Sequence, residues 1–150
     1  MEESIELADQ IKEKLNLREI DANLLSPLVL AYIGDAIYEV VIRTKIISDT
    51  DTTVNKLHLM STKLVKAHAQ AEIVKSLELT EEEEKIYKRG RNAKSYTKAK
   101  NATLQDYRNA TGFEALMGYL YLGGRTERML EIINEGLKKY TDKIKPYLSD

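Results

Sequence analysis

Apolar residues recur every three to four positions along most of this chain, which is the spacing of one face of an α-helix. Between about residues 3 and 16 they are Ile5, Ala8, Ile11 and Leu15, separated mainly by charged and polar side chains. Residue pairs that favour two-residue hairpin turns between alternating strands, such as Asn-Gly or Asp-Gly, are absent. The pattern predicts an all-α protein.

The longest apolar run follows Ser26 and Pro27, a combination typical of a helix start. It extends from Leu28 to about Ile47, which is too apolar for a solvent-exposed helix and far longer than a strand of about 5–6 residues. We therefore predict that this segment is the buried central helix.

The middle of the chain carries further helical signals. Residues 53–78 predict one long helix or two helices joined by a kink. Thr80 and Glu83 have the spacing of a capping box, and the short helix that they open is expected to end at Gly90.

Residues 91–102 lack apolar periodicity, which predicts a polar, exposed loop. Helical periodicity returns over about 103–122, with Thr111 and Gly112 as a candidate break and Gly123-Gly124 as the expected end, and again over about 126–140. No internal repeat or long linker interrupts the chain, so residues 1–150 are expected to form a single domain with a core over about 24–140.

Composition narrows the class of protein. The chain has 150 residues, 43% of them hydrophobic, which is enough for one globular core. It contains no cysteine, which excludes thiol catalysis, thiolate metal sites and disulfides. No apolar run approaches the ~18 residues of a membrane span, and the N-terminus lacks the apolar region of a signal peptide. We expect a soluble, cytoplasmic protein.

The charge is unevenly distributed. The formal net charge is −1, but residues 85–108 carry eight basic side chains and one acid, so this segment has +7 and the rest of the chain −8. A solvated basic loop balanced by the acids of residues 81–84 would explain such a run. Because the basic residues continue past the helix into a loop, where hydrogen-bonding side chains are interleaved with them, we favour contact with a phosphate backbone.

Two acids stand in apolar helical surroundings. Asp35 follows Gly34 in the middle of the predicted central helix, and Glu114 is the one acid between Gly112 and Leu122. An ionised carboxylate is unfavourable there unless it is paired or binds a metal, and glycine weakens a helix by about 1 kcal/mol. The two acids either serve Lys or Arg partners or together hold Mg²⁺, which prefers oxygen ligands.

Other chemistry has little support. His58 and His68 do not share a helix face, and neither has a carboxylate at the spacing of zinc proteases. Glycine-rich phosphate-binding motifs are absent from the sequence.

Three segments in order resemble one known family. The run Leu30-Ala31-Tyr32-Ile33-Gly34-Asp35-Ala36 resembles the signature helix of the ribonuclease III family, and Phe113-Glu114-Ala115 with Gly118 and Tyr121-Leu122 resembles its second acidic motif. Between them, Lys88-Arg89-Gly90-Arg91-Asn92-Ala93-Lys94 is similar to the basic loop of the short bacterial branch called Mini-ribonuclease III. The resemblance covers about residues 26–125.

This resemblance implies a helical, homodimeric endonuclease domain that cuts double-stranded RNA with Mg²⁺ and acts in maturation of large-subunit (23S) ribosomal RNA. It implies Asp35 and Glu114 as catalytic metal ligands. It also implies a chain without a separate double-stranded-RNA-binding domain, and a ribosomal protein or pre-ribosomal particle as a further candidate partner. The RNA-binding residues that we expect are Arg89, Arg91, Asn92, Lys94, Lys98 and Lys100.

The resemblance is incomplete at three positions. Long members of the family carry further acids where this chain has Leu28, Ala31 and Thr111, so only Asp35 and Glu114 carry over as metal ligands. Two alternatives remain open: a non-catalytic RNA-binding or ribosome-assembly module with the same fold, and a helical dimerisation domain, against which the basic segment argues.

Overall fold

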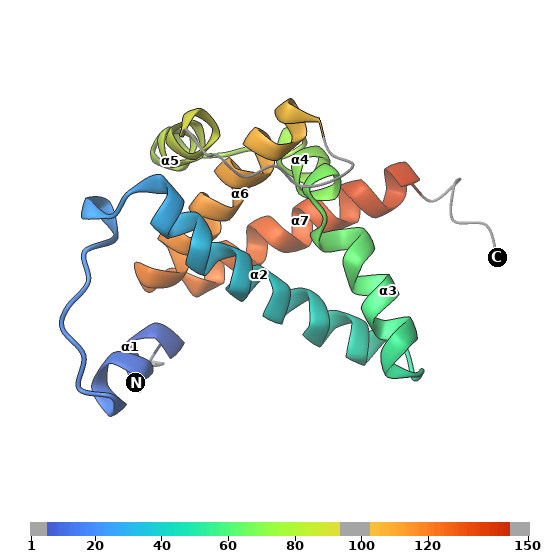
Figure 1. The fold of residues 1–150 in the computed structure, drawn as a ribbon, viewed down its shortest axis with the longest axis horizontal. Helices are drawn as coiled ribbons and strands as arrows, with labels where there is room; N and C mark the ends of the chain where they lie inside the picture. The colour runs from blue at the N-terminus through green and yellow to red at the C-terminus, as the bar shows by residue number, and fades with distance from the viewer. Residues whose placement is uncertain (1–5, 94–102, 145–150) are drawn as a thin grey trace.

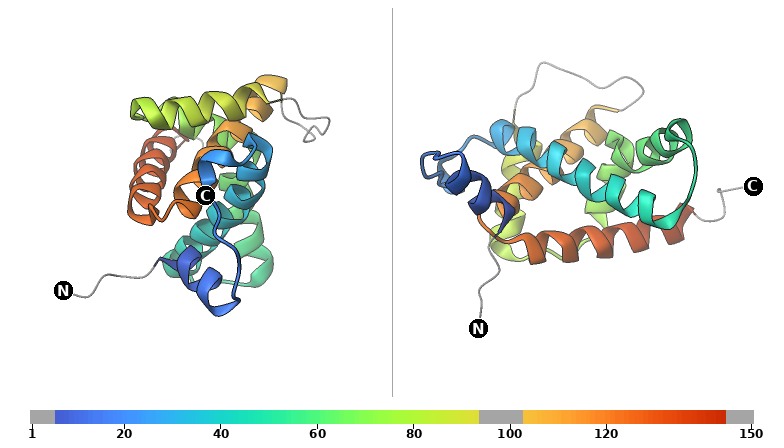
Figure 2. Two further views of the ribbon diagram at one scale, coloured as in Figure 1. Left: turned by 90° about the vertical axis from the view of Figure 1, so that its left-hand side faces the viewer. Right: turned by 90° about the horizontal axis from the view of Figure 1, so that it is seen from below.

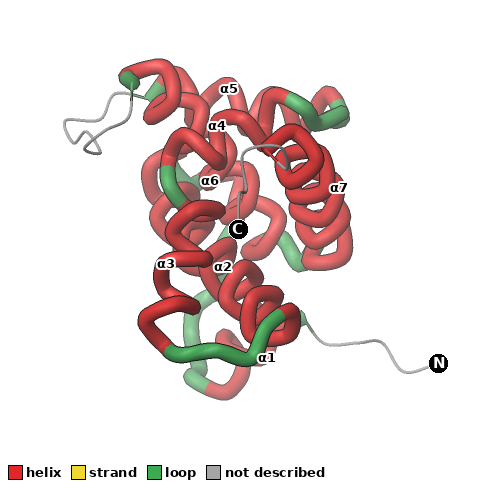
Figure 3. The backbone as a smooth tube through the Cα atoms, turned by 90° about the vertical axis from the view of Figure 1, so that its right-hand side faces the viewer, coloured by secondary structure: helices red, strands yellow, loops and turns green. Residues whose placement is uncertain are grey.

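A computed structural model describes residues 6–93 and 103–144, and in these two ranges all regular structure is helical (Figures 1 and 3). The prediction of an all-α protein is confirmed. The elements are α1 (Leu7–Lys14), the 3₁₀ turn η1 (Ala22–Leu24), α2 (Pro27–Asp49), α3 (Val54–Val65), α4 (Ala67–Lys75), α5 (Glu81–Asn92), α6 (Leu104–Leu122) and α7 (Thr126–Ile144).

Helix α6 forms the centre of the molecule. Helices α2, α4, α5 and α7 pack around it, and twelve of its nineteen residues are buried (Figure 1). The apolar run of α2 predicts this central place for α2, and that prediction is wrong. Helix α2 packs one face against α6 and leaves Tyr32 81% exposed on another face.

The start of α2 follows the sequence prediction. The Ser26 hydroxyl accepts a hydrogen bond from the backbone N–H of Val29 at 3.3 Å, and Pro27 occupies the first helical position. A hydroxyl cap satisfies an N–H group that has no partner inside the helix, and proline has none to satisfy.

The segment 53–78 forms two helices, α3 and α4, because Lys66 has an extended conformation between them. Its backbone, at φ −66° and ψ 155°, cannot continue a helix. The kinked alternative of the sequence prediction is therefore the correct one.

The predicted capping box of α5 is present. The Thr80 hydroxyl accepts from the Glu83 N–H at 3.2 Å, while the Glu83 carboxylate accepts from the Thr80 N–H at 2.9 Å. The predicted end at Gly90 is wrong, because α5 continues to Asn92. A Cβ atom at Gly90 would lie 2.8 Å from Ala115 Cβ, so this glycine serves helix packing instead.

The candidate break at Thr111 and Gly112 is also absent, because α6 runs through both residues. A Cβ atom at Gly112 would lie 2.6 Å from the backbone oxygen of Tyr87 in α5. Glycines on both helices thus allow α5 and α6 to pack closely. The true end of α6 is the predicted one, at Gly123 and Gly124, where Gly124 adopts a φ of +71° that favours glycine.

Helix α1 lies at the end of the molecule where α2 begins, apart from the packed helices (Figure 2). Among its residues, Ala8 is the buried one. In the described part of the chain, no helix combines the length and the apolar character needed to cross a membrane.

Candidate functional site

The two acidic motifs meet where α2 crosses α6 at close range. A Cβ atom added to Gly34 would lie 1.7 Å from the backbone oxygen of Glu114, and one added to Gly118 would lie 2.0 Å from that of Leu30. Only glycine fits at such distances. The glycine that weakens α2 therefore lets its neighbour Asp35 approach Glu114.

The carboxyl groups of Asp35 and Glu114 lie close enough to interact. Burial raises the pKa of Glu114, and the neighbouring carboxyl of Asp35 raises it further, to about 9. Two adjacent carboxylates repel each other when both are ionised, so Glu114 without a cation retains its proton at neutral pH. A hard divalent cation that binds carboxylate oxygens would remove this repulsion, so the pair fits Mg²⁺.

Asp35 itself is exposed, although the sequence suggested a buried position. The reason is that α2 buries a single face, and Asp35 lies at the edge of that face while Gly34 lies within it. Glu39, one turn further along, forms a 2.7 Å ion pair with Arg43 of the same helix, so its charge already has a partner. The exposure of Asp35 leaves the pair accessible to solvent ions.

The three positions that depart from the family pattern add no carboxylate to the site. Ala31 is buried in the core, and Leu28 is exposed. The Thr111 hydroxyl donates to the backbone carbonyl of Tyr107 at 2.9 Å, a bond within its own helix. Two acids, rather than a larger cluster, therefore meet at this crossing.

Gln70 is a site residue that the sequence analysis missed. It lies on α4, is 1% exposed, and its side-chain amide faces the Glu114 carboxyl, where it opposes the rise in the pKa of Glu114. Its Nε2 atom is buried without an acceptor at hydrogen-bonding distance. The sequence does not single out Gln70, because the polar residues His68 and Glu72 alternate with it in the same stretch.

The end of α5 brings basic side chains to the same stretch of α6. Arg89 is exposed, and Arg91 lies 5.8 Å from the centre of the Tyr87 ring, a cation–π contact. Arg91 Nε also donates to the exposed Asn92 side chain at 3.3 Å. The other expected RNA-binding residues, Lys94, Lys98 and Lys100, lie outside the described residues.

A second acidic cluster escaped the sequence analysis because its members come from two helices. His68 Nδ1 lies 2.8 Å from Asp106 Oδ2, and Glu72 offers an oxygen close to both. Lys143 contacts the Glu72 carboxylate at 2.6 Å, and Lys75 contacts it at 3.1 Å. The two lysines already neutralise this cluster, which weakens its case as a metal site.

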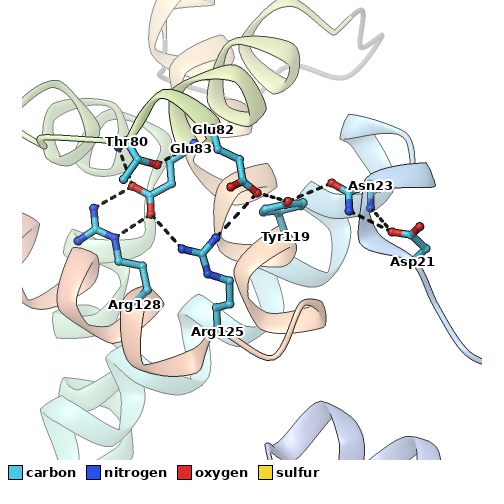
Figure 4. A network of polar contacts seen from close by, with 8 residues as sticks. All are labelled: Asp21, Asn23, Thr80, Glu82, Glu83, Tyr119, Arg125 and Arg128. Atoms are coloured by element: carbon cyan, nitrogen blue, oxygen red, sulfur yellow. Dashed lines mark hydrogen bonds and ion pairs between the residues drawn. The ribbon is translucent and has the colours of Figure 1, made fainter.

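Glu83 is a buried acid whose neighbour is a base, in contrast to Glu114, whose neighbour is the acid Asp35. It is 0% exposed and accepts hydrogen bonds from Arg128 of α7 at 2.7 and 2.8 Å, as Figure 4 shows. These bonds hold the pKa of Glu83 below its ordinary value. The pair ties the start of α5 to α7.

The same network continues to the start of α2 (Figure 4). The Tyr119 hydroxyl contacts the Glu82 carboxylate and lies 3.0 Å from Asn23 Oδ1, and the Asn23 N–H donates to Asp21 at 2.9 Å. A cleft of about 560 Å³ lies beside these residues, lined by acids and bases in mixture. This arrangement fixes the segment that leads into α2.

Residues 28–125 match the family model described as "Ribonuclease III domain". The chain is 54% identical to the Mini-ribonuclease 3 of Clostridium tetani over 125 residues, which is 81% of this chain and 83% of that protein. It is 54% identical to the Mini-ribonuclease 3 of Enterococcus faecalis, over 79% of this chain and 93% of that protein. A crystal structure of a Fusobacterium nucleatum protein has a TM-score of 0.70 and 33% identity, covering 77% of this chain and 94% of its own.

Proposed function

This chain belongs to the ribonuclease III family, and from that premise we propose that Asp35 and Glu114 form the Mg²⁺-binding centre of its endonuclease activity. The enzyme is an endoribonuclease of the ribonuclease III type that acts on double-stranded RNA. The observation that carries the proposal is the contact between the two acids across the α2–α6 crossing.

Each acid has a distinct part in the proposed centre. Asp35 is exposed and supplies an accessible carboxylate, whereas Glu114 is held more deeply and ionises when a cation compensates the Asp35 charge. Together the two carboxylates would hold Mg²⁺, which would supply a water ligand of lowered pKa and positive charge to offset that of the phosphate. With two protein acids, phosphate oxygens of the RNA are suited to complete the cation's ligands.

Basic side chains would hold the duplex beside the acids. Arg89, Arg91 and Asn92 at the end of α5 lie on the helix whose glycine, Gly90, packs against Ala115, the neighbour of Glu114. An A-form helix is recognised mainly through its backbone and shape, so these residues are expected to grip phosphates without reading bases. We assign the same role to Lys94, Lys98 and Lys100.

A homodimer would let two subunits each cut one strand. Helix α2 supports this proposal, because it exposes a set of apolar side chains along its length, which a second copy would cover. They are Leu28, Val29, Tyr32, Val40 and Ile47. The proposed substrate is a precursor of large-subunit (23S) ribosomal RNA in the cytoplasm, presented in a pre-ribosomal particle or with a ribosomal protein.

A gel assay of duplex RNA with Mg²⁺ or with EDTA tests the centre. The wild-type protein should cut in Mg²⁺ alone, and Asp35→Asn should bind the duplex but leave it uncut, because it removes the exposed carboxylate. Sedimentation of the same samples gives the mass of the assembly. Full cleavage by Asp35→Asn would overturn the assignment.

The non-catalytic RNA-binding module is the rival account. It predicts that the wild-type protein shifts duplex RNA on the gel but leaves it uncut at every Mg²⁺ concentration. The same experiment therefore separates the two functions.

A further inference from the structure

Gln70 is a buried donor without an acceptor, which is unusual among the residues that the structure describes. Its Nε2 atom is the buried side-chain nitrogen or oxygen there for which no hydrogen-bond partner is found. More than 90% of buried polar groups in proteins are paired, and an unpaired one costs about 1–3 kcal/mol. An apolar side chain of similar size would therefore suit the packing of α4 better than glutamine does.

The surroundings of Gln70 explain what such a donor can do. Its helix packs against α6, and the amide faces the carboxyl of Glu114 from the side of α4, whereas Asp35 reaches the same carboxyl from α2. An amide N–H is a donor and a carboxylate oxygen is an acceptor, so the carboxyl of Glu114 is the group in these surroundings that can serve as the missing partner.

We propose that Gln70 is the positioning residue for Glu114, whose carboxylate its Nε2–H group holds in the orientation that binds the divalent cation. This inference rests on the proposed metal centre at Asp35 and Glu114. Long members of the family have acids at the positions of Ala31 and Thr111. With fewer acidic ligands, the metal affinity of this chain depends more strongly on the orientation of each one, which Gln70 would fix for Glu114.

Replacement of Gln70 by methionine tests the proposal, because methionine has a similar length and shape but no donor. The melting temperature of Gln70→Met without metal should equal or exceed that of the wild-type protein, since an unpaired buried donor is removed. The rise in melting temperature on addition of Mg²⁺ should shrink, because a ligand stabilises the fold in proportion to its affinity. The half-saturating Mg²⁺ concentration for cleavage should rise by about 10–100-fold.

Ile73→Val is the matched control, since Ile73 is equally buried on the same helix and the change removes one methylene. It should lower the melting temperature slightly and leave the Mg²⁺ requirement unchanged. If Gln70→Met does not fold, Gln70→Leu provides the second apolar replacement for the same measurements.

A variant with the wild-type Mg²⁺ response in both melting and cleavage would overturn the role of Gln70. Asp35→Asn, measured in parallel, separates this result from failure of the metal centre itself. An inactive Asp35→Asn together with a wild-type response of Gln70→Met refutes the Gln70 inference alone. An Asp35→Asn protein with wild-type cleavage and Mg²⁺ response refutes the centre and the inference together.

Discussion

Glu83 and Glu114 are two glutamates in the helical core with opposite electrostatic surroundings. Glu83 is paired with Arg128, and the bonds from that guanidinium lower its pKa. Glu114 is half-buried beside Asp35, and loss of solvent together with the neighbouring Asp35 carboxyl raises its pKa to about 9. Glu83 has a basic partner within the chain, whereas Glu114 forms no ion pair with a basic side chain among the residues that the structure describes. This difference distinguishes an acid that maintains the fold from one suited to bind a metal ion.

The largest expected effect comes from Glu114→Gln. It should reduce cleavage of duplex RNA at least about a thousandfold, which is roughly 4 kcal/mol of transition-state stabilisation. The metal-free protein should become more stable at pH 7.5, by about 1–3 kcal/mol, because a carboxyl with a raised pKa destabilises the fold above its unfolded pKa. Cleavage assays and urea unfolding check the two parts, and a destabilised variant would contradict the contrast with Glu83.

Arg128→Met should have the reverse pattern. It leaves the Glu83 charge buried without its partner, which costs about 3–5 kcal/mol of unfolding free energy. Cleavage per folded molecule should remain at the wild-type level, as measured after correction for the unfolded fraction. Arg125→Met is the control: Arg125 lies 3.9 Å from Glu82 and 4.0 Å from Glu83 and is 42% exposed, so its loss should cost less than about 1 kcal/mol.

The two glutamates should also give stability opposite dependences on pH. The contribution of Glu114 is fully present below its unfolded pKa of 4.5 and is lost as pH rises toward 9. The contribution of Glu83 is present above its unfolded pKa of 4.5 and is lost as pH falls through its lowered folded pKa. Urea unfolding of the metal-free protein between pH 5 and pH 9 should therefore show that Glu114→Gln becomes increasingly more stable than the wild type. The difference in unfolding free energy should grow by at most about 1.4 kcal/mol per pH unit.

Glu83→Gln should unfold more easily than the wild type at neutral pH, and this loss of unfolding free energy should become smaller as the pH falls below 4.5. Stability curves that stay parallel to the wild-type curve for both variants would remove the electrostatic distinction between the two sites.

The smallest effect is expected at the basic end of α5. Arg89→Gln should weaken duplex binding a few-fold and reduce the slope of log affinity against log salt by about 0.9 if one phosphate contact is lost. The slope is obtained from titrations at several salt concentrations, with Lys56→Gln on α3 as a control of equal charge change. A slope equal to that of the control would place Arg89 outside the RNA interface.

Local chemistry made several features of the fold predictable. The Ser26 cap with Pro27, the capping box at Thr80 and the turn at Gly124 each depend on neighbours in sequence, and all three are confirmed. Gly90 was misread as a helix end because a capping glycine and a packing glycine are the same residue. What separates them is the partner helix, here Ala115 of α6, which the local sequence does not contain.

In the candidate site, too, local sequence predicts some features, and others depend on the packing of helices. Asp35 and Glu114 were found because each breaks a helical pattern, and the structure brings them together. The apolar residues of α2 suggested a buried helix, but composition does not tell which faces of a helix are covered, and α2 leaves apolar side chains such as Tyr32 exposed. Gln70 was overlooked because its only distinction, an amide that faces Glu114, arises from tertiary packing.

Proton release on metal binding is the measurement that tests the central claim most directly. The wild-type protein, weakly buffered at pH 7.5 and titrated with MgCl₂ in a pH-stat, should release about one proton for each Mg²⁺ bound, because Glu114 must lose its proton to bind the ion. Glu114→Gln should release none, and Arg125→Met should behave as the wild type. Mg²⁺ binding by the wild-type protein without proton release, or equal release by Glu114→Gln, would contradict the account.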